Sequence, residues 1–444
     1  MIRNMNLLPV SLGCDKNLVD SEHMIAKLCA AGYTLTDDED EADVVLINTC
    51  CFIHDAKTES IDTILEMARL KDKRLKALIV CGCLAQRYRE EIKKEIPEVD
   101  AIVGTDEADR IVEITDRAVK GGDEGTGDGL HNSSKRIITT PGHYEYLKIA
   151  EGCDKHCTYC IIPKLRGTYR SVPMEDLLEE AESLAKSGVK ELIIVAQETT
   201  LYGVDLYGEK KLPELLCKLS GIEGIRWIRI LYAYPEEITD ELIEVMSTNP
   251  KICRYIDMPI QSGSDGVLGR MGRLTSSRDI RDVIARLRDK MPDICIRTTL
   301  ITGFPGETSK DHEETYRFVN EMEFDRLGVF TYSAEEGTPA YDMKDQIDEE
   351  VKKERQAELY ELQQAISYET GLTFIGKTME VIVDGYLPED DVYVARSYRD
   401  APDIDGMIFV YSGRELETGD MVKVKIRDAK EYDLEGELID ESAE

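Results

Sequence analysis

Glu151–Cys160 reads Glu-Gly-Cys-Asp-Lys-His-Cys-Thr-Tyr-Cys, with three cysteines in a C-x3-C-x2-C pattern. The loop directly follows the apolar run Tyr146–Ala150, a predicted strand. Three thiolates on one loop can bind three irons of a cubane iron–sulfur cluster and leave the fourth iron open. Zinc would normally take a fourth protein ligand, which His156 could supply. The spacing favours an iron–sulfur cluster, with zinc as the alternative.

The loop opens a long alternation of strands and helices over residues 141–371. Helical patterns near residues 174–187, 236–248, 276–290 and 308–321 separate the predicted strands. Six βα units in sequence predict a complete or partial parallel barrel, with active residues at the carboxyl ends of the strands. The strands are expected at Tyr146–Ala150, Glu191–Ala196, Ile225–Leu231, Tyr255–Ile260, Ile294–Ile301 and Arg326–Tyr332. A polar helix should follow at 347–370, with Val351, Leu359, Leu362 and Ile366 as its buried stripe.

Two further domains are expected on either side of the barrel. Residues 1–120 also alternate, which predicts an open α/β domain with a parallel sheet. Its predicted strands are Leu7–Leu12, Val44–Ile47, Leu78–Cys81 and Ala101–Val103, and its predicted helices are near 17–30, 56–70, 85–95 and 108–119. Residues 121–140 are glycine-rich and predict a linker. Residues 372–444 carry short β-rich runs between turn residues, which predicts a small antiparallel β-barrel. The fold class is therefore α/β with a small β-domain at the end.

Single cysteines end three of the predicted strands of the first domain. Cys14, Cys50 and Cys83 could meet in space, because the carboxyl ends of parallel strands share one edge of a sheet. Cys51 and Cys81 lie beside them, so strand geometry alone does not choose the set. No secretory or membrane segment is predicted, so the protein is expected in the cytoplasm. Thiols stay reduced there, and clustered cysteines indicate a metal site or catalysis.

The cysteine loop resembles that of the radical S-adenosylmethionine superfamily, with Tyr159 at the aromatic position. This implies that Cys153, Cys157 and Cys160 hold a [4Fe–4S] cluster whose open iron binds S-adenosylmethionine. Three amino-terminal stretches, at 13–17, 48–50 and 82–88, resemble the motifs of the methylthiotransferases. That resemblance covers nearly the whole chain and implies a second [4Fe–4S] cluster on Cys14, Cys50 and Cys83. Cys51 stands where the family usually has glycine, and Cys81 is a further cysteine in addition to the three motif cysteines.

The same resemblance implies which residues surround S-adenosylmethionine. Each group lies on or directly after a predicted barrel strand, and together they are Gln197, Glu198, Gln261, Ser262, Arg297 and Gly303. Arg166 and Arg170 could pair with carboxylates of substrate or cofactor, although a structural role is an equal alternative. The six histidines are scattered, and no side-chain acid or base is predicted.

Charge indicates the kind of substrate. The chain has 55 Lys and Arg against 89 Asp and Glu, a net charge of −34, which disfavours nucleic acid as the main partner. Leu372–Glu444 alone has 8 basic and 19 acidic residues. This region resembles a TRAM domain, and an acidic version should attract a basic protein.

The methylthiotransferase family contains enzymes that modify tRNA adenosine and enzymes that modify an aspartate of small-subunit ribosomal protein twelve. Asp400–Gly406 and the stretch at 11–22 resemble the protein-modifying branch, whereas Ser262 stands where that branch commonly has histidine. The expected reaction is therefore methylthio transfer to the β-carbon of that aspartate, with a tRNA enzyme as the alternative. The resemblance also implies a low-potential electron donor and a sulfur donor as partners.

Overall fold

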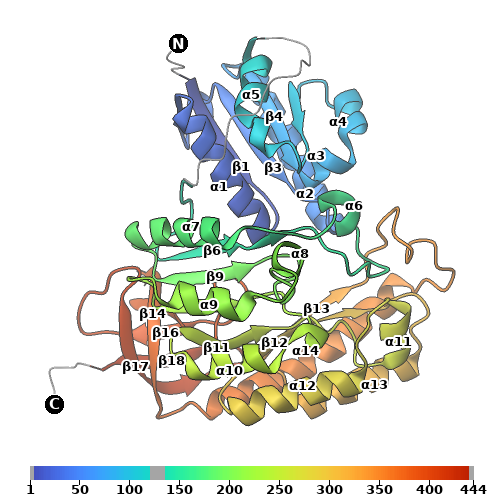
Figure 1. Cartoon of the computed structure of the whole chain (residues 1–444), viewed down its shortest axis with the longest axis vertical. Helices are drawn as coiled ribbons and strands as arrows, with labels where there is room; N and C mark the ends of the chain where they lie inside the picture. The colour runs from blue at the N-terminus through green and yellow to red at the C-terminus, as the bar shows by residue number, and fades with distance from the viewer. Residues whose placement is uncertain (1–4, 121–135, 440–444) are drawn as a thin grey trace.

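The amino-terminal unit is a five-stranded parallel sheet in the computed structural model, which describes residues 5–120 and 136–439. The strand order is β2-β1-β3-β4-β5 (Figure 1). The strands are β1 Met5–Ser11, β2 Tyr33–Leu35, β3 Val44–Thr49, β4 Ala77–Gly82 and β5 Ala101–Val103. The helices are α1 Asp15–Ala30, α2 His54–Ala68, α3 Cys83–Arg87, α4 Arg89–Glu95 and α5 Ile111–Lys120. The predicted open α/β unit is confirmed.

Two details of this unit differ from the sequence prediction. Strand β2 was not predicted, because three residues carry too little pattern. The single helix expected at 85–95 is two helices, which meet at Tyr88, where the backbone leaves helical geometry at φ −120° and ψ 33°. The glycine-rich part of the predicted linker, residues 121–135, lies outside the described residues.

The central unit is a six-stranded parallel sheet in the order β13-β12-β11-β10-β9-β6, which confirms the predicted partial barrel. Its strands are β6 Tyr144–Lys148, β9 Glu191–Val195, β10 Trp227–Ile230, β11 Ile252–Asp257, β12 Cys295–Thr302 and β13 Arg326–Thr331. A short hairpin of β7 Ala150–Glu151 and β8 Arg170–Ser171 brackets the cysteine loop. The helices are α6 Ile162–Arg166, α7 Met174–Lys186, α8 Val204–Tyr207, α9 Leu212–Ser220, α10 Asp240–Thr248, α11 Asp265–Arg270, α12 Ser277–Lys290, α13 Ser309–Met322 and α14 Glu349–Leu372.

Alternate residues of the central strands enter different cores. On β9, Leu192 and Ile194 pack among residues of the surrounding helices. Ile193 and Val195 pack in a second cluster, which also contains Val19 of α1 and Ile382 of the carboxyl-terminal unit. Helices therefore cover one face of the sheet, and the two flanking units cover the other.

The stripe predicted for α14 is partly wrong. Leu359 and Ile366 are buried, but Val351 and Leu362 are only half-buried. Lys352 is fully buried and its ammonium donates to the backbone oxygen of Tyr332 at 2.9 Å. The buried side of this helix is therefore partly polar, because it also lies against backbone oxygens along the edge strand β13, such as that of Val329, which accepts from Gln356 at 2.6 Å.

The carboxyl-terminal unit is a closed five-stranded barrel in the order β14-β15-β16-β18-β17. The strands are β14 Thr378–Leu387, β15 Val392–Ser397, β16 Ile408–Tyr411, β17 Met421–Ala429 and β18 Leu434–Leu438. The sequence predicts this barrel from four β-rich runs, Thr378–Val383, Val392–Ala395, Met407–Tyr411 and Met421–Ile426, and predicts no strand at β18. The barrel docks on the central sheet, where Asp400 pairs with Arg326 at 2.5 Å and Asp405 pairs with Arg297 at 3.4 Å.

Candidate active site

Cys14, Cys50 and Cys83 lie at one edge of the amino-terminal sheet. They follow β1, β3 and β4, which are adjacent in the sheet and parallel. The backbone of Gly13 (φ +91°) approaches Cys50 so closely that an added Cβ would lie 3.1 Å from the Cys50 sulfur. Burial raises the pKa of Cys50 to about 11, and the neighbouring thiols of Cys14 and Cys83 contribute to the rise. The three thiols thus form one group, as expected from the strand ends.

Two asparagines hold these three loops together. Asn17 donates to the backbone oxygens of Leu12 and Thr49 at 3.0 and 3.2 Å, and its Oδ1 lies 4.0 Å from the Cys83 sulfur. Asn48 donates to the Asn17 backbone oxygen at 2.8 Å. Both asparagines lie in the motifs that contain the cysteines, but sequence reasoning gave them no role.

The extra cysteines occupy different places. The Cys81 thiol donates to the backbone oxygen of Ile47 at 3.3 Å, inside the sheet. Cys51 is fully buried in the apolar core beside Cys50. The four remaining cysteines fall within predicted helices or strands, so the sequence predicts them in the core: Cys29, Cys217, Cys253 and Cys295. Cys253 and Cys295 are buried, but Cys29 is half-buried and Cys217 is exposed on α9, so the prediction is wrong for these two.

The central cysteines lie on the loop between β7 and α6. Gly152 (φ +80°) fits against Thr168, whose backbone oxygen would lie 2.2 Å from an added Cβ. The Thr158 amide donates to the Met271 backbone oxygen at 2.9 Å, which fixes the middle of the loop. Burial raises the pKa of Cys160 to about 12, and the Cys157 and Cys153 thiols contribute to the rise.

The cysteine geometry fits a cluster better than a single ion. Nowhere in the described residues do three His, Cys, Asp or Glu side chains converge closely enough to hold one metal ion. In a cubane cluster each thiolate binds a different iron, so the sulfurs need not converge on a point. Each set offers three thiols, which suits a [4Fe–4S] cluster with one open iron, whereas the described residues contain no preformed site for a single zinc ion.

Gln197 and Glu198 follow β9 and lie beside the central loop. The Gln197 amide donates to Glu151 at 2.8 Å, while its own oxygen has no partner among the described residues. One oxygen of Glu198 accepts the Thr200 amide at 3.0 Å, and the other is buried without a partner in the described chain. Burial raises the pKa of Glu198 to about 8. Such unsatisfied buried oxygens fit a site for a polar, cationic ligand.

Gln261 and Ser262 follow β11, and their side chains make different contacts. Gln261 has a left-handed backbone (φ 72°), and its side-chain oxygen is buried without a partner in the part of the chain described. The Ser262 hydroxyl instead lies 3.1 Å from the Thr315 hydroxyl of α13 and accepts the Ser264 amide at 3.1 Å. Ser262 therefore stabilises the turn, and Gln261 is the residue free to bind a ligand.

Arg297 and Gly303 also have structural partners. Arg297 donates to Asp257 at 2.7 Å and pairs with Asp405 of the carboxyl-terminal barrel. Gly303 (φ +70°) directly follows β12, and its amide donates to Glu307 at 3.0 Å. An added Cβ there would lie 2.2 Å from the side chain of Lys352. Gln197, Glu198 and Gln261 therefore each keep a buried side-chain oxygen without a partner among the described residues, while Arg297 connects two units.

Arg166, at the end of α6, joins the two cysteine sites. Its guanidinium donates to Asp20 at 2.6 Å and to Asn17 at 2.5 Å in the amino-terminal unit, and to Glu151 at 2.9 Å in the central unit. Burial opposes ionisation of Glu151, but Lys148 and Arg166 outweigh it and hold the pKa of that carboxyl at about 2. Arg170, the other arginine considered, is exposed and donates to backbone oxygens.

A second contact joins the units beside Cys14. The Lys16 ammonium lies 3.1 Å from the centre of the Tyr232 ring, and the Tyr232 hydroxyl donates to Asp15 at 3.2 Å. Tyr232 follows β10 and has a left-handed backbone (φ 58°). Figure 1 shows α6 at this boundary, beside α2 and α3. The two cysteine sites therefore face each other across one boundary.

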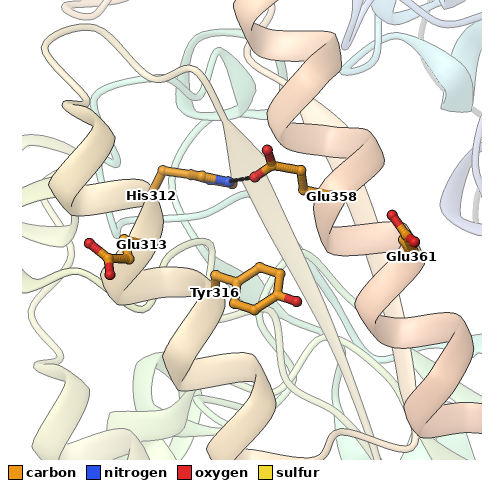
Figure 2. Close-up of a pocket in the computed structure, with 5 residues that line it drawn as sticks. All are labelled: His312, Glu313, Tyr316, Glu358 and Glu361. Atoms are coloured by element: carbon orange, nitrogen blue, oxygen red, sulfur yellow. Dashed lines mark hydrogen bonds and ion pairs between the residues drawn. The ribbon is translucent and has the colours of Figure 1, made fainter.

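A surface groove of about 380 Å³ lies elsewhere, between α13 and α14. Figure 2 shows His312 of α13 pointing toward Glu358 of α14, 2.7 Å away. None of its lining residues is a predicted site residue, and we assign it no part in the chemistry.

Three family profiles match the chain. They are Uncharacterized protein family UPF0004 at residues 7–104, the Radical SAM superfamily at 147–319 and the TRAM domain at 375–439. The structure resembles the radical S-adenosylmethionine methyltransferase TsrM from Kitasatospora setae, with a TM-score of 0.57 and 13% identity over 85% of this chain and 78% of that one. It also resembles the cobalamin-dependent S-adenosylmethionine radical enzyme OxsB, with a TM-score of 0.52 and 13% identity over 77% of this chain and 55% of that one. These structures support the fold alone.

The fold and the cysteine loop define a radical S-adenosylmethionine enzyme with an added TRAM barrel. Relatives named "Ribosomal protein uS12 methylthiotransferase RimO" are 58% identical in Lachnoclostridium phytofermentans, over 97% of this chain and 99% of the relative, and 52% identical in Thermoanaerobacter sp. strain X514, over 96% and 98%. The chain belongs to this RimO family of methylthiotransferases. No helix in residues 5–120 or 136–439 is long and apolar enough to cross a membrane.

Proposed function

We propose that this enzyme adds a methylthio group to the β-carbon of an aspartate in ribosomal protein uS12, using S-adenosylmethionine and two [4Fe–4S] clusters. Membership of the RimO family supports the substrate and the use of S-adenosylmethionine. The observation that carries the two-cluster part is the Arg166 contact, because this side chain donates to Asn17 beside one set of three cysteines and to Glu151 beside the other.

Each set of three thiols would hold one cluster. Cys153, Cys157 and Cys160 are the ligands proposed for the central cluster, and Cys14, Cys50 and Cys83 for the amino-terminal one. When bound, the central cluster on Cys153, Cys157 and Cys160 would supply the electron for cleavage of S-adenosylmethionine, and the amino-terminal cluster on Cys14, Cys50 and Cys83 would carry the sulfur for transfer. Because buried thiols must lose their protons to bind iron, loading should release protons.

The residues around the central loop would bind and orient S-adenosylmethionine. The free oxygens of Gln197, Glu198 and Gln261 suit its ammonium and hydroxyl groups. Ser262 and Gly303 would shape the turns around it, and Arg297 would act indirectly, by fixing the barrel against the sheet. Hydrogen-atom removal needs no side-chain base, so none is assigned.

The partners follow from this chemistry. The reaction needs a low-potential electron donor and a sulfur donor, and a ribosomal-protein substrate suits a cytoplasmic enzyme. The exposed acidic residues of the carboxyl-terminal barrel suit a basic protein such as uS12. The separation into residues 1–120, 121–140, 141–371 and 372–444 stays a prediction that limited proteolysis can check.

Iron analysis tests the two-cluster proposal. Anaerobically reconstituted enzyme should bind about eight irons per chain, and the variant Cys14→Ala/Cys50→Ala/Cys83→Ala about four. A Cys217→Ala variant is the matched control, because that thiol is exposed and lies on α9. About four irons in the unchanged enzyme would contradict the proposal.

A further inference from the structure

Lys16 is a buried cation at the boundary between the two cysteine sites. It lies in the first turn of α1, two residues after Cys14, and is only 6% exposed. Its ammonium lies 3.0 Å from Asp15 Oδ1 and 3.1 Å from the centre of the Tyr232 ring. Among the described residues, Asp15 is the only carboxylate that forms an ion pair with it. An ammonium has three N–H donors, so Lys16 keeps the capacity to bind a second anion.

Asp15 also has hydrogen-bonding capacity that the protein does not use. The Tyr232 hydroxyl donates to Oδ1 at 3.2 Å, whereas Oδ2 is buried and has no partner within the described part of the chain. The Asp15 side chain as a whole is 8% exposed. Buried polar atoms are nearly always hydrogen-bonded in folded proteins. The Asp15–Lys16 pair therefore marks a place where a polar ligand would complete the contacts.

Tyr232 fixes this pair against the carboxyl end of the central sheet. Its amide donates to Asp257 Oδ2 at 3.0 Å, and its backbone oxygen accepts the Thr199 amide at 3.1 Å. Thr199 directly follows Glu198, in the segment proposed to bind S-adenosylmethionine. The left-handed backbone of Tyr232 (φ 58°) costs free energy and is held by these contacts. Lys16 thus lies between Cys14 and the S-adenosylmethionine segment.

Two other cations at this boundary are more fully paired. Arg166 donates to Asp20 at 2.6 Å and to Glu151 at 2.9 Å. Lys148 forms ion pairs with the same two carboxylates. Lys16 has one carboxylate partner instead of two. A carboxylate that enters the boundary can therefore bind Lys16 without displacing a protein carboxylate.

We infer that Lys16 binds the carboxylate of the target aspartate and makes the enzyme specific for it. The inference rests on the proposed function, in which the β-carbon loses hydrogen at one cysteine site and gains sulfur from the other. The substrate must then lie between the two sites, where Lys16 lies. The carboxylate is bonded directly to the β-carbon, so a charge-assisted hydrogen bond to it also positions the reacting carbon. A neutral adenine base offers no anion for this contact, which favours a protein substrate.

A double-mutant cycle tests this by binding, without turnover. Anaerobically reconstituted enzyme and its Lys16→Gln variant are each titrated with unmodified uS12 and with uS12 in which asparagine replaces the target aspartate. For the unchanged enzyme, loss of the carboxylate should weaken binding roughly 10-fold, as expected for one charge-assisted hydrogen bond. For Lys16→Gln, the two forms of uS12 should bind equally.

Lys27→Gln is the matched control, because Lys27 lies on the same helix and pairs with the exposed Asp109 at 2.5 Å. It should keep the preference for the aspartate form of uS12. Asp15→Asn gives a prediction of opposite sign: it removes the partner that competes for the ammonium, so the preference should increase. A purely structural role of Lys16 would not produce that increase.

Iron content of each variant shows whether both clusters are loaded, and Asp15→Asn carries the test where Lys16→Gln loads poorly. An undiminished preference in Lys16→Gln, or a reduced preference in Asp15→Asn, would overturn the inference. Failure of the proposed function is distinguishable, because the unchanged enzyme would then leave uS12 unmodified. That result would overturn the inference as well.

Discussion

Arg166 shows how one side chain can join two reaction centres. It reaches Asp20, Asn17 and Glu151, which belong to elements far apart in sequence. Sequence reasoning predicted the cysteines, because the chemistry of thiolates and their spacing are visible locally. It left Arg166 open between a ligand and a structural role, because its partners come from another domain. The same holds for Arg297, whose partner Asp405 is a residue of the barrel.

Replacement of Arg166 should destabilise the boundary between the units. Arg166→Gln removes this cation, but Lys148 still pairs with both Asp20 and Glu151, so the loss should be about 1.5–3 kcal/mol. Arg166→Lys cannot reach all three partners with one ammonium and should recover only part of this. Denaturant midpoints of the metal-free protein measure the effect. Arg170→Gln, an exposed neighbour, should change stability by less than about 0.5 kcal/mol, and equal losses for both arginines would contradict the assignment.

At the scale of elements, the sequence predicted most accurately the positions of the strands that lead into a cysteine loop. Strands β3 and β4 are continuous buried runs bounded by turn residues, so their pattern is clear. Strands β2 and β18 were missed, since a short strand forms only when a neighbour supplies its hydrogen bonds. The polar stripe of α14 was missed because its partners are backbone oxygens.

Gly82 between β4 and α3 should be essential for the amino-terminal cluster. Its φ is +91°, and an added Cβ would lie 2.2 Å from Asn48 Oδ1 and 2.6 Å from the Thr49 backbone oxygen. Gly82→Ala should therefore displace the loops of Cys50 and Cys83 and reduce iron from about eight to about four per chain. Gly269→Ala on α11 is the control, because an added Cβ meets nothing within 4 Å there. Full iron loading of Gly82→Ala would contradict this role.

At the scale of the whole molecule, the acidic charge divides into two kinds. Asp400 and Asp405 of the barrel are neutralised by arginines of the central sheet, so the Asp400–Gly406 motif holds the barrel in place. This corrects the simplest interpretation of the sequence, in which the acidic excess as a whole was a docking surface. Exposed acids on barrel loops, such as Glu389, Asp390 and Glu417, are those that can meet a basic protein.

Binding of uS12 should depend on these exposed acids. The variant Glu389→Gln/Asp390→Asn/Glu417→Gln should slow association with uS12 and reduce its sensitivity to salt, because long-range attraction is screened beyond about 10 Å at 0.1 M salt. Stopped-flow binding at several salt concentrations measures this. Neutralising Glu90 and Glu91 of α4 serves as the control. An equal effect of the two variants would show that only net charge matters.

The central claim is that this enzyme modifies uS12, and mass spectrometry of uS12 tests it most directly. Ribosomal proteins and tRNA would be compared between a strain that lacks the gene, the same strain carrying the intact gene, and one carrying the Cys14→Ala/Cys50→Ala/Cys83→Ala variant. We predict that uS12 carries a methylthio group on one aspartate only when the intact gene is present. Unmodified uS12 together with gene-dependent methylthioadenosine in tRNA would contradict the account.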